Sequence, residues 1–158
     1  MPDHRDLGPR LSHRLTYLLK YALVTLDGLH EEQLAPSGIS VRELAVLLML
    51  VDREPESQQQ AAHRLAVDRT TMVGLLDGLE DKGLVTRRPD AADRRRNVVE
   101  LTDAGHRVLE EATRASDVAE QRLLADLGER DAARLRELLG RLATGTGRGA
   151  PEGTPDPA

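Results

Sequence analysis

The segment VDRTTMVGLLDGLEDKGLVTRRPDAADRRRNVVELTDAG (Val67–Gly105) decides the fold. Its first third has the periodicity of an amphipathic helix, which we expect from Arg69 to Lys82. Asp68 is a suitable N-cap for that helix, and Gly83 suits the left-handed position that closes one. The apolar positions that share one face of this helix are Met72, Leu75, Leu76 and Leu79.

Two short β-prone runs follow that helix, over residues 84–87 and 97–101. Residues 88–96 lie between them and include a proline and two aspartates, which favour a turn. This connection is too long for a tight hairpin. The sequence therefore predicts a pair of strands joined by a protruding wing, defined here as residues 88–96.

Helix-start signals also precede the opening segment. Ser40 and Glu43 have the spacing of a capping box, and we expect the helix after them to bury one face. That face comprises Leu44, Leu47, Leu48 and Val51. Ser57 and Gln60 repeat the box before a short helix that ends at Leu65. With the turn at 66–67 and the helix from Arg69, this is a helix-turn-helix pattern.

The flanks predict further helices on both sides. Apolar residues recur at steps of three and four over residues 10–35, and again over residues 102–143 after a cap at Thr102. We interpret both regions as dimerisation helices, although core packing alone would give the same stripe. Residues 1–9 are predicted to be a flexible arm, and the Gly- and Pro-rich residues 144–158 a disordered tail. The fold class is mainly α with a small β-wing, a winged helix-turn-helix over residues 36–101.

Composition excludes several functional classes. The 158 residues include no cysteine, which rules out disulfides and thiolate chemistry. No apolar run approaches 18 residues and no signal-peptide pattern is present, so we expect a cytoplasmic protein without membrane contact. The five histidines lack metal-ligand spacing, and neither a phosphate-binding loop nor a nucleophile elbow is found. We therefore expect no enzyme activity, no metal and no cofactor.

Charge is concentrated at the wing. Residues 86–96 contain five arginines and two aspartates, a net charge of +3, so the rest of the chain has −8 of the total −5. An arginine run in an exposed loop is often only solvated charge. Next to a helix-turn-helix and between two strands, the run instead indicates contact with nucleic-acid phosphates.

The predicted DNA-binding residues lie on the helix expected from Arg69 to Lys82 and on the wing. The start of that helix would enter the major groove with Arg69, Thr70 and Thr71, while the wing would follow the neighbouring minor groove. Gly74, on the exposed face, would permit close approach to DNA, or it reflects neutral drift. The wing contributes Arg88, Arg94, Arg95 and Arg96.

The stretch from Gly83 to Gly105 resembles the wing signature of the MarR family of regulators. The matching residues are Gly83, Leu84, Val85, Arg87, Asp93, Arg95, Leu101, Thr102 and Gly105. The resemblance covers roughly residues 10–143. It implies a homodimer that reads a pseudo-palindromic operator in double-stranded DNA, with Arg95 in the minor groove and Asp93 bracing the wing through an ion pair. It also implies release from DNA by a small, often aromatic, effector.

The chain departs from the family pattern on the helix expected from Arg69 to Lys82 and at a position near the family's effector pocket. Val73-Gly74 stands where members often have Thr-Arg, and Leu44 stands where an aromatic residue is common. Tyr17 and Tyr21 share one face of the helix expected over residues 10–35. We hypothesise that they line an effector pocket together with Leu44 and Leu48. Interface or core packing is the competing interpretation of the tyrosine pair.

The function predicted from sequence is a homodimeric, sequence-specific DNA-binding regulator of transcription. We expect a repressor that a small-molecule effector releases from DNA. The alternative is a winged-helix module that binds a protein partner without reading DNA. The net-acidic body and the glycines at 74 and 78 favour that alternative, and the arginines of the wing oppose it.

Overall fold

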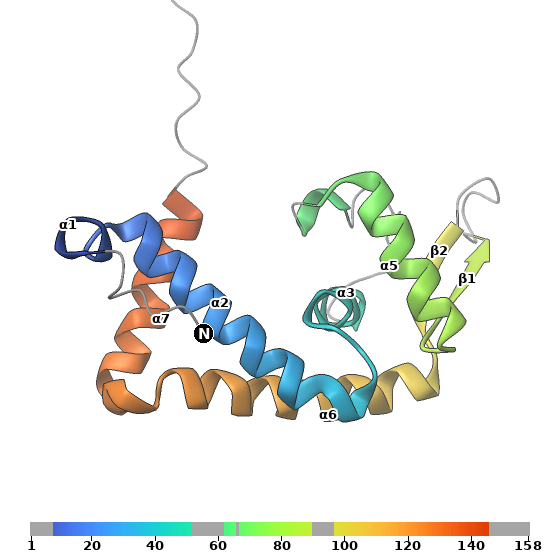
Figure 1. The fold of residues 1–158 in the computed structure, drawn as a ribbon. Helices are drawn as coiled ribbons and strands as arrows, with labels where there is room; N and C mark the ends of the chain where they lie inside the picture. The colour runs from blue at the N-terminus through green and yellow to red at the C-terminus, as the bar shows by residue number, and fades with distance from the viewer. Residues whose placement is uncertain (1–7, 52–61, 66, 90–96, 146–158) are drawn as a thin grey trace, which may run out of the picture. The chain divides into compact units, whose positions relative to one another are not determined.

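The computed structural model describes residues 8–51, 62–65, 67–89 and 97–145, and it forms two compact units, Met1–Leu123 and Leu124–Ala158 (Figure 1). The helices of the first unit, besides a helical turn at residues 62–64, are α1 (Pro9–Ser12), α2 (Leu15–Leu34), η2 (Ala35–Ser37), α3 (Val41–Val51), α5 (Arg69–Asp81) and α6 (Asp103–Leu123). Its strands are β1 (Val85–Pro89) and β2 (Asn97–Leu101). The second unit contains η3 (Ala125–Leu127) and α7 (Gly128–Gly145).

Helix α3 lies at the centre of the first unit, in contact with α2, α5, α6 and β2. Val46 and Leu47 of α3 are fully buried, together with Leu34, Met72, Leu76 and Leu79 from the neighbouring helices. The expected buried face of α3 is wrong in part, because Leu48 and Val51 are 38% and 41% exposed. The buried arc is centred on Glu43, Val46 and Leu47 instead, since the neighbouring elements pack on that side.

The expected continuous helix over residues 10–35 is also corrected. It is divided at Arg14, whose extended backbone (ψ 130°) separates α1 from α2. The amide of Arg14 closes α1 on the Leu11 carbonyl, and its own carbonyl accepts the first hydrogen bonds of α2. Ser12 and His13 are weaker helix formers than the leucines that follow, which favours a break here. Gly38, with a φ of 66°, ends this region.

Helices α2 and α6 pack against each other in the first unit, where the C-terminal half of α2 crosses α6 (Figure 1). Ala112 and Ala119 of α6 are fully buried, and their small side chains let the two backbones approach closely. Two polar contacts align the helices. The His30 ring nitrogen Nε2 and the Ser116 hydroxyl are 3.0 Å apart, and Arg122 donates to Glu32 at 2.8 Å.

Strands β1 and β2 form the expected antiparallel hairpin, with Val85 opposite Leu101 and Pro89 opposite Asn97. The first strand begins one residue later and ends two residues later than the sequence indicated. Thr102 caps α6 as predicted, because its hydroxyl accepts from the Gly105 amide at 3.0 Å and donates to the Gly83 carbonyl at 2.7 Å. The hairpin is thereby tied to the start of α6.

Helix α6 ends at Leu123, and η3 follows it. In the second unit, Gly128, with a φ of 69°, begins α7. The tail predicted from residue 144 is corrected at its first two positions. Thr144 and Gly145 belong to α7, where the Thr144 hydroxyl donates to the Gly140 carbonyl. The predicted arm is also corrected at its end, because Pro9 begins α1. Residues 1–7 of the arm and residues 146–158 of the tail lie outside the described residues.

No single described helix is long and apolar enough to cross a membrane. Leu15–Ser37 and Val41–Val51 reach the required length and apolarity only when taken together, across a bend of 70°.

Gly105→Ala should destabilise the fold. An added Cβ would lie 2.0 Å from the Leu84 carbonyl oxygen, which already accepts a hydrogen bond from the Thr102 amide. We expect a loss of about 3 kcal/mol in the free energy of unfolding, measured by urea denaturation at a fixed protein concentration. Gly74→Ala is the matched control, because nothing lies within 4 Å of its added Cβ. Equal stability of the two variants would contradict the close approach.

Candidate functional site

Helix α5 is held at its start by a local cap. Asp68 accepts hydrogen bonds from the Thr71 amide at 2.9 Å and from the Thr71 hydroxyl at 2.6 Å. These bonds from Thr71, the hydroxyl first, lower the pKa of the Asp68 carboxyl below its usual value. The N-cap predicted from sequence is therefore confirmed. The hydroxyl proton of Thr71 is used inside the helix, so a base contact by this group would have to use its oxygen as the acceptor.

The outer face of α5 is exposed at its N-terminal half. Arg69, Thr70 and Gly74 are exposed, whereas Met72, Leu76 and Leu79 are buried on the opposite face. An added Cβ at Gly74 would meet nothing within 4 Å. The helix thus presents one cation, one hydroxyl and one bare stretch of backbone to its surroundings, as the sequence predicted.

Arg87 fixes the hairpin to α5, although it was not among the residues predicted to bind DNA. Its guanidinium forms ion pairs with both Asp77 and Glu80, and its side chain is mostly buried. Partial burial disfavours the charged form, but Asp77 and Glu80 outweigh it and raise the pKa of Arg87 above its usual value. The signal in the sequence was the place of Arg87 in the wing signature, although its partners could not be inferred from spacing.

Arg88, predicted to contact DNA, is exposed and forms an ion pair with Glu100 on β2. Two of the five arginines counted between residues 86 and 96 are therefore neutralised by carboxylates of the same protein. The charge of +3 overstates the free positive charge of this region. Asp93, Arg94, Arg95 and Arg96 lie outside the described residues, as do Ser57 and Gln60, and their roles stay predictions.

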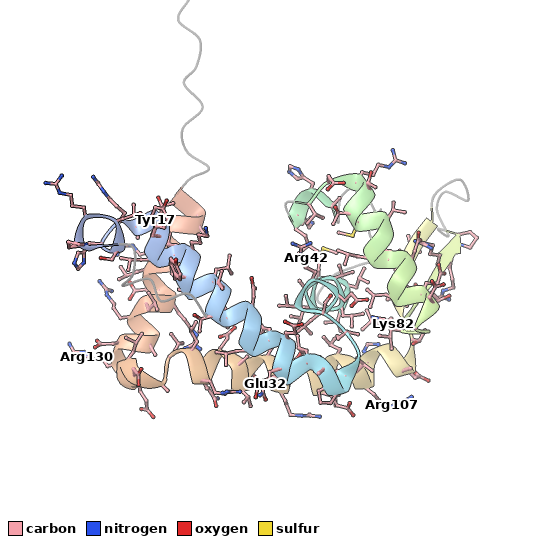
Figure 2. The ribbon with its side chains drawn as sticks, viewed as in Figure 1. Tyr17, Glu32, Arg42, Lys82, Arg107 and Arg130 are labelled. Carbon is pink, nitrogen blue, oxygen red and sulfur yellow. The ribbon has the colours of Figure 1, made fainter. Side chains whose placement is uncertain are left out.

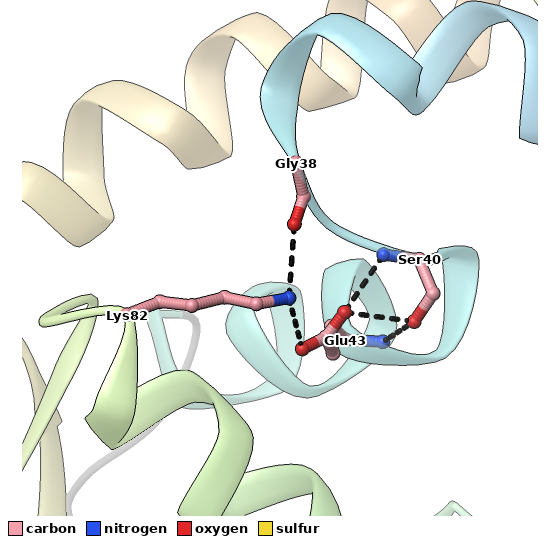
Figure 3. A network of polar contacts seen from close by, with 4 residues as sticks. All are labelled: Gly38, Ser40, Glu43 and Lys82. Carbon is pink, nitrogen blue, oxygen red and sulfur yellow. Dashed lines mark hydrogen bonds and ion pairs between the residues drawn. The ribbon is translucent and has the colours of Figure 1, made fainter.

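A polar network joins the end of α5 to the start of α3 (Figure 3). The Glu43 carboxylate accepts from the Ser40 amide at 2.8 Å and from the Ser40 hydroxyl at 3.0 Å, which confirms the predicted capping box. Its other oxygen accepts from Lys82 Nζ at 2.7 Å, and the same Nζ donates to the Gly38 carbonyl at 2.9 Å. Burial disfavours the charge on Glu43, yet these bonds outweigh it and lower its pKa below the usual 4.5.

The network borders a cavity of about 430 Å³ where α2 turns into α3. Leu34, Ile39 and Val41 give it apolar walls, and Asp27 and Glu31 add carboxylates. Gly38, Ser40 and His30 also line it.

The four residues of the effector-pocket hypothesis do not line this cavity. Tyr17 and Tyr21 are half-buried on α2 (Figure 2 labels Tyr17), Leu44 is buried in the core, and Leu48 is exposed. Their contact with a ligand stays a prediction.

Comparison with known proteins places this architecture in a family. Residues 37–96 match the MarR family. The chain is 29% identical over 100 residues to the transcriptional repressor NicR of Pseudomonas putida, covering 63% of each protein. It is 31% identical over 107 residues to the transcriptional regulator PecS of Dickeya dadantii, covering 66% of this chain and 64% of PecS. The alignments therefore span a little under two thirds of these relatives.

Solved structures extend the likeness over most of the chain. The transcriptional repressor CouR, bound to a 23-mer DNA duplex, is 31% identical with a TM-score of 0.79, covering 85% of this chain and 95% of CouR. The chain belongs to the MarR family. MarR from E. coli is 27% identical with a TM-score of 0.71, covering 82% of this chain and 96% of that protein. The matched proteins are regulators of transcription rather than enzymes, and the winged-helix fold predicted from sequence is confirmed.

Gly74→Ala tests whether DNA approaches the bare backbone of α5. Alanine is favoured over glycine in a helix interior, so we expect this variant to gain about 1 kcal/mol in the free energy of unfolding. If the backbone at Gly74 meets DNA, affinity for an operator should fall about ten-fold despite that gain. Thermal unfolding and fluorescence anisotropy on the same preparation measure both quantities. Unchanged affinity would assign Gly74 to neutral variation.

The Glu43 network should make stability depend on pH. Because the folded-state pKa of Glu43 lies below 4.5, the stability that this group contributes is present above pH 4.5. It is lost as the pH falls from there through the folded-state pKa. Glu43→Gln should cost about 2 kcal/mol at neutral pH, since it removes charge-assisted hydrogen bonds. Urea denaturation at stepwise lower pH should show the two stabilities converging, and parallel curves would argue against this assignment.

Proposed function

We propose that the protein is a sequence-specific DNA-binding regulator of transcription that acts as a repressor. The observation that carries this proposal is the exposed N-terminal half of α5, with Arg69 and Thr70, on a helix whose other face is fixed in the core. A helix presented in this way fits the major groove with its first residues at the base edges. The hairpin beside α5 would direct the wing toward the adjacent minor groove (Figure 1).

The comparisons support the same function. CouR, whose fold this chain shares, has been solved on a DNA duplex and is named a transcriptional repressor. NicR is also named a repressor. The assignment of this chain as a repressor rather than an activator rests on these names, because the fold itself serves either outcome.

A homodimer is part of the proposal. In the first unit, Leu15 and Leu23 on α2 are 64% and 58% exposed. In the second unit, Leu142 on α7 is 60% exposed, and Leu135, Leu138 and Leu139 on the same helix are also exposed. Apolar side chains gathered on a helix in this way usually have a partner. A second copy would cover them and would read a pseudo-palindrome with half-sites about 34–36 Å apart.

The domain assignments follow from this proposal. Residues 10–35 and 102–143 would form the dimerisation region, and residues 36–101 the DNA-binding region. The wing signature supports the second assignment, and the exposed leucines of α2 and α7 support the first.

Release by a small-molecule effector completes the proposal. CouR has also been solved with p-coumaroyl-CoA, so a member of the family holds a small molecule. In this chain, the cavity of about 430 Å³ lies within the range of about 300–1,000 Å³ found for ligand pockets. Its apolar walls suit an apolar effector, and a molecule there would touch Gly38 and Ser40, next to the network that reaches α5.

The competing function is a winged-helix module that binds a protein and does not read DNA. The ion pairs of Arg87 and Arg88 favour it, because they remove free positive charge beside α5. The DNA-bound structure of CouR weighs against it.

The decisive experiment is fluorescence anisotropy on DNA upstream of the protein's own gene and on a scrambled duplex, at several salt concentrations. Wild type should prefer the upstream DNA and show a steep salt dependence. Arg95→Ala should bind about ten-fold more weakly and lower the salt slope by about two for a dimer. Sedimentation of the same samples should give the mass of two chains.

Arg107→Ala is the matched control, because Arg107 is exposed on α6 rather than on α5 or the wing (Figure 2). It should leave affinity and salt slope unchanged. If wild type showed no preference among duplexes selected from the whole genome, DNA regulation would be excluded. Loss of a protein partner in Arg95→Ala would then support the competing function.

A further inference from the structure

The direction of α5 is incompletely fixed by its apolar contacts. Met72, Leu76 and Leu79 anchor its inner face in the core, but apolar burial is not directional and tolerates small rotations. Polar contacts with defined geometry restrict such rotations more strongly. Among the described residues, α5 and its C-cap make such contacts at two places. Asp77 and Glu80 form ion pairs with Arg87, and Lys82 binds the start of α3 and the turn before it.

Lys82 is the C-cap residue of α5, and it reaches two fixed points outside that helix. Its Nζ donates to the Glu43 carboxylate at 2.7 Å and to the Gly38 carbonyl at 2.9 Å (Figure 3). Glu43 lies in the first turn of α3, and Gly38 belongs to the turn between η2 and α3. One ammonium group therefore joins the end of α5 to two neighbouring segments that lie 39 and 44 residues earlier in the sequence.

The anchor that Lys82 meets is rigid. Glu43 is 9% exposed, and its second carboxylate oxygen is occupied by the amide and the hydroxyl of Ser40. The backbone of α5 also passes close by, since a Cβ added to Gly78 would lie 3.5 Å from the Glu43 oxygen that binds Lys82. The carboxylate cannot turn away without breaking the cap of α3.

We propose that Lys82 is a positioning residue, which through Glu43 and Gly38 sets the direction in which α5 presents Arg69 and Thr70 to DNA. The inference rests on the proposed DNA-binding function and adds a residue that does not itself touch DNA. Helix α5 has 13 residues, so Arg69 lies roughly 20 Å from the joint at Lys82. A tilt of about 10° at the joint would move Arg69 by roughly 3 Å, more than base recognition tolerates.

Two competing roles for Lys82 lead to different binding behaviour. Its side chain is 41% exposed, so its charge could contact a DNA phosphate directly. It could also contribute only to stability. A phosphate contact weakens binding to every sequence and flattens the salt dependence, whereas a stabilising contact changes the melting temperature without changing sequence preference. A positioning role alters preference and leaves the salt slope unchanged.

The experiment compares Lys82→Met, Lys82→Arg and Glu43→Gln with the wild-type protein. Each is titrated on a genome-selected operator and on a scrambled duplex at several salt concentrations, below its measured melting temperature. Lys20→Met is the matched control, because Lys20 is the other lysine of the chain and is exposed on α2. The double variant Lys82→Met with Glu43→Gln tests whether the two residues act as one unit.

We expect Lys82→Met to lower operator affinity about ten-fold with unchanged affinity for the scrambled duplex and an unchanged salt slope. Lys82→Arg should restore most of the preference, because a guanidinium still reaches Glu43. Glu43→Gln should resemble Lys82→Met, and the double variant should be no worse than either single variant.

Equal losses on both duplexes with a flatter salt slope would overturn the proposal in favour of a phosphate contact. A lower melting temperature with the full sequence preference would overturn it in favour of a purely stabilising role. Loss of preference by Lys20→Met as well would also overturn it. If wild type itself showed no preference, the proposed function would fail and this inference with it. If the wild type shows a preference and Lys82→Met keeps it, the proposed function would stand and only this inference would fail.

Discussion

The carboxylate of Glu43 is the constraint on which the packing of α3, α5 and the turn after η2 depends. It is nearly buried, and a buried charge is tolerated only when its hydrogen-bonding capacity is met. Ser40 meets one oxygen and Lys82 meets the other (Figure 3). The start of α3, the turn after η2 and the end of α5 must therefore come together for the charge to be stable, which makes one residue the meeting point of three segments.

Most described residues of the wing signature have structural roles in this chain. Gly83 takes a positive φ after α5, and Thr102 binds its carbonyl while capping α6. Gly105 lets the Leu84 carbonyl lie against the first turn of α6, where any side chain would collide with it. Arg87 closes the hairpin onto α5. A pattern that identifies a DNA-binding family is thus largely the set of residues that builds the support for its DNA-binding parts.

Ion pairs within the protein reduce the positive charge that residues 86–96 can offer to a partner. Arg87 and Arg88 bind Asp77, Glu80 and Glu100, so much of the local positive charge is spent within the fold. A chain with a net charge of −5 is a poor general binder of polyanions. If the proposed function holds, weak non-specific attraction would raise the share of DNA binding that depends on base contacts.

The sequence by itself determined the elements whose signals are local. The caps at Ser40, Asp68 and Thr102, the helix stop at Gly83 and the buried face of α5 all arise from residues within one or two turns of each other, where spacing fixes contact. It placed the exposed start of α5 correctly for the same reason. Only the tertiary structure decided which face of α3 is buried, that Arg87 and Arg88 are paired within the protein, and that Lys82 meets Glu43. Those outcomes join residues on separate elements, and their partners are chosen by how the helices pack around α3, which local spacing does not encode.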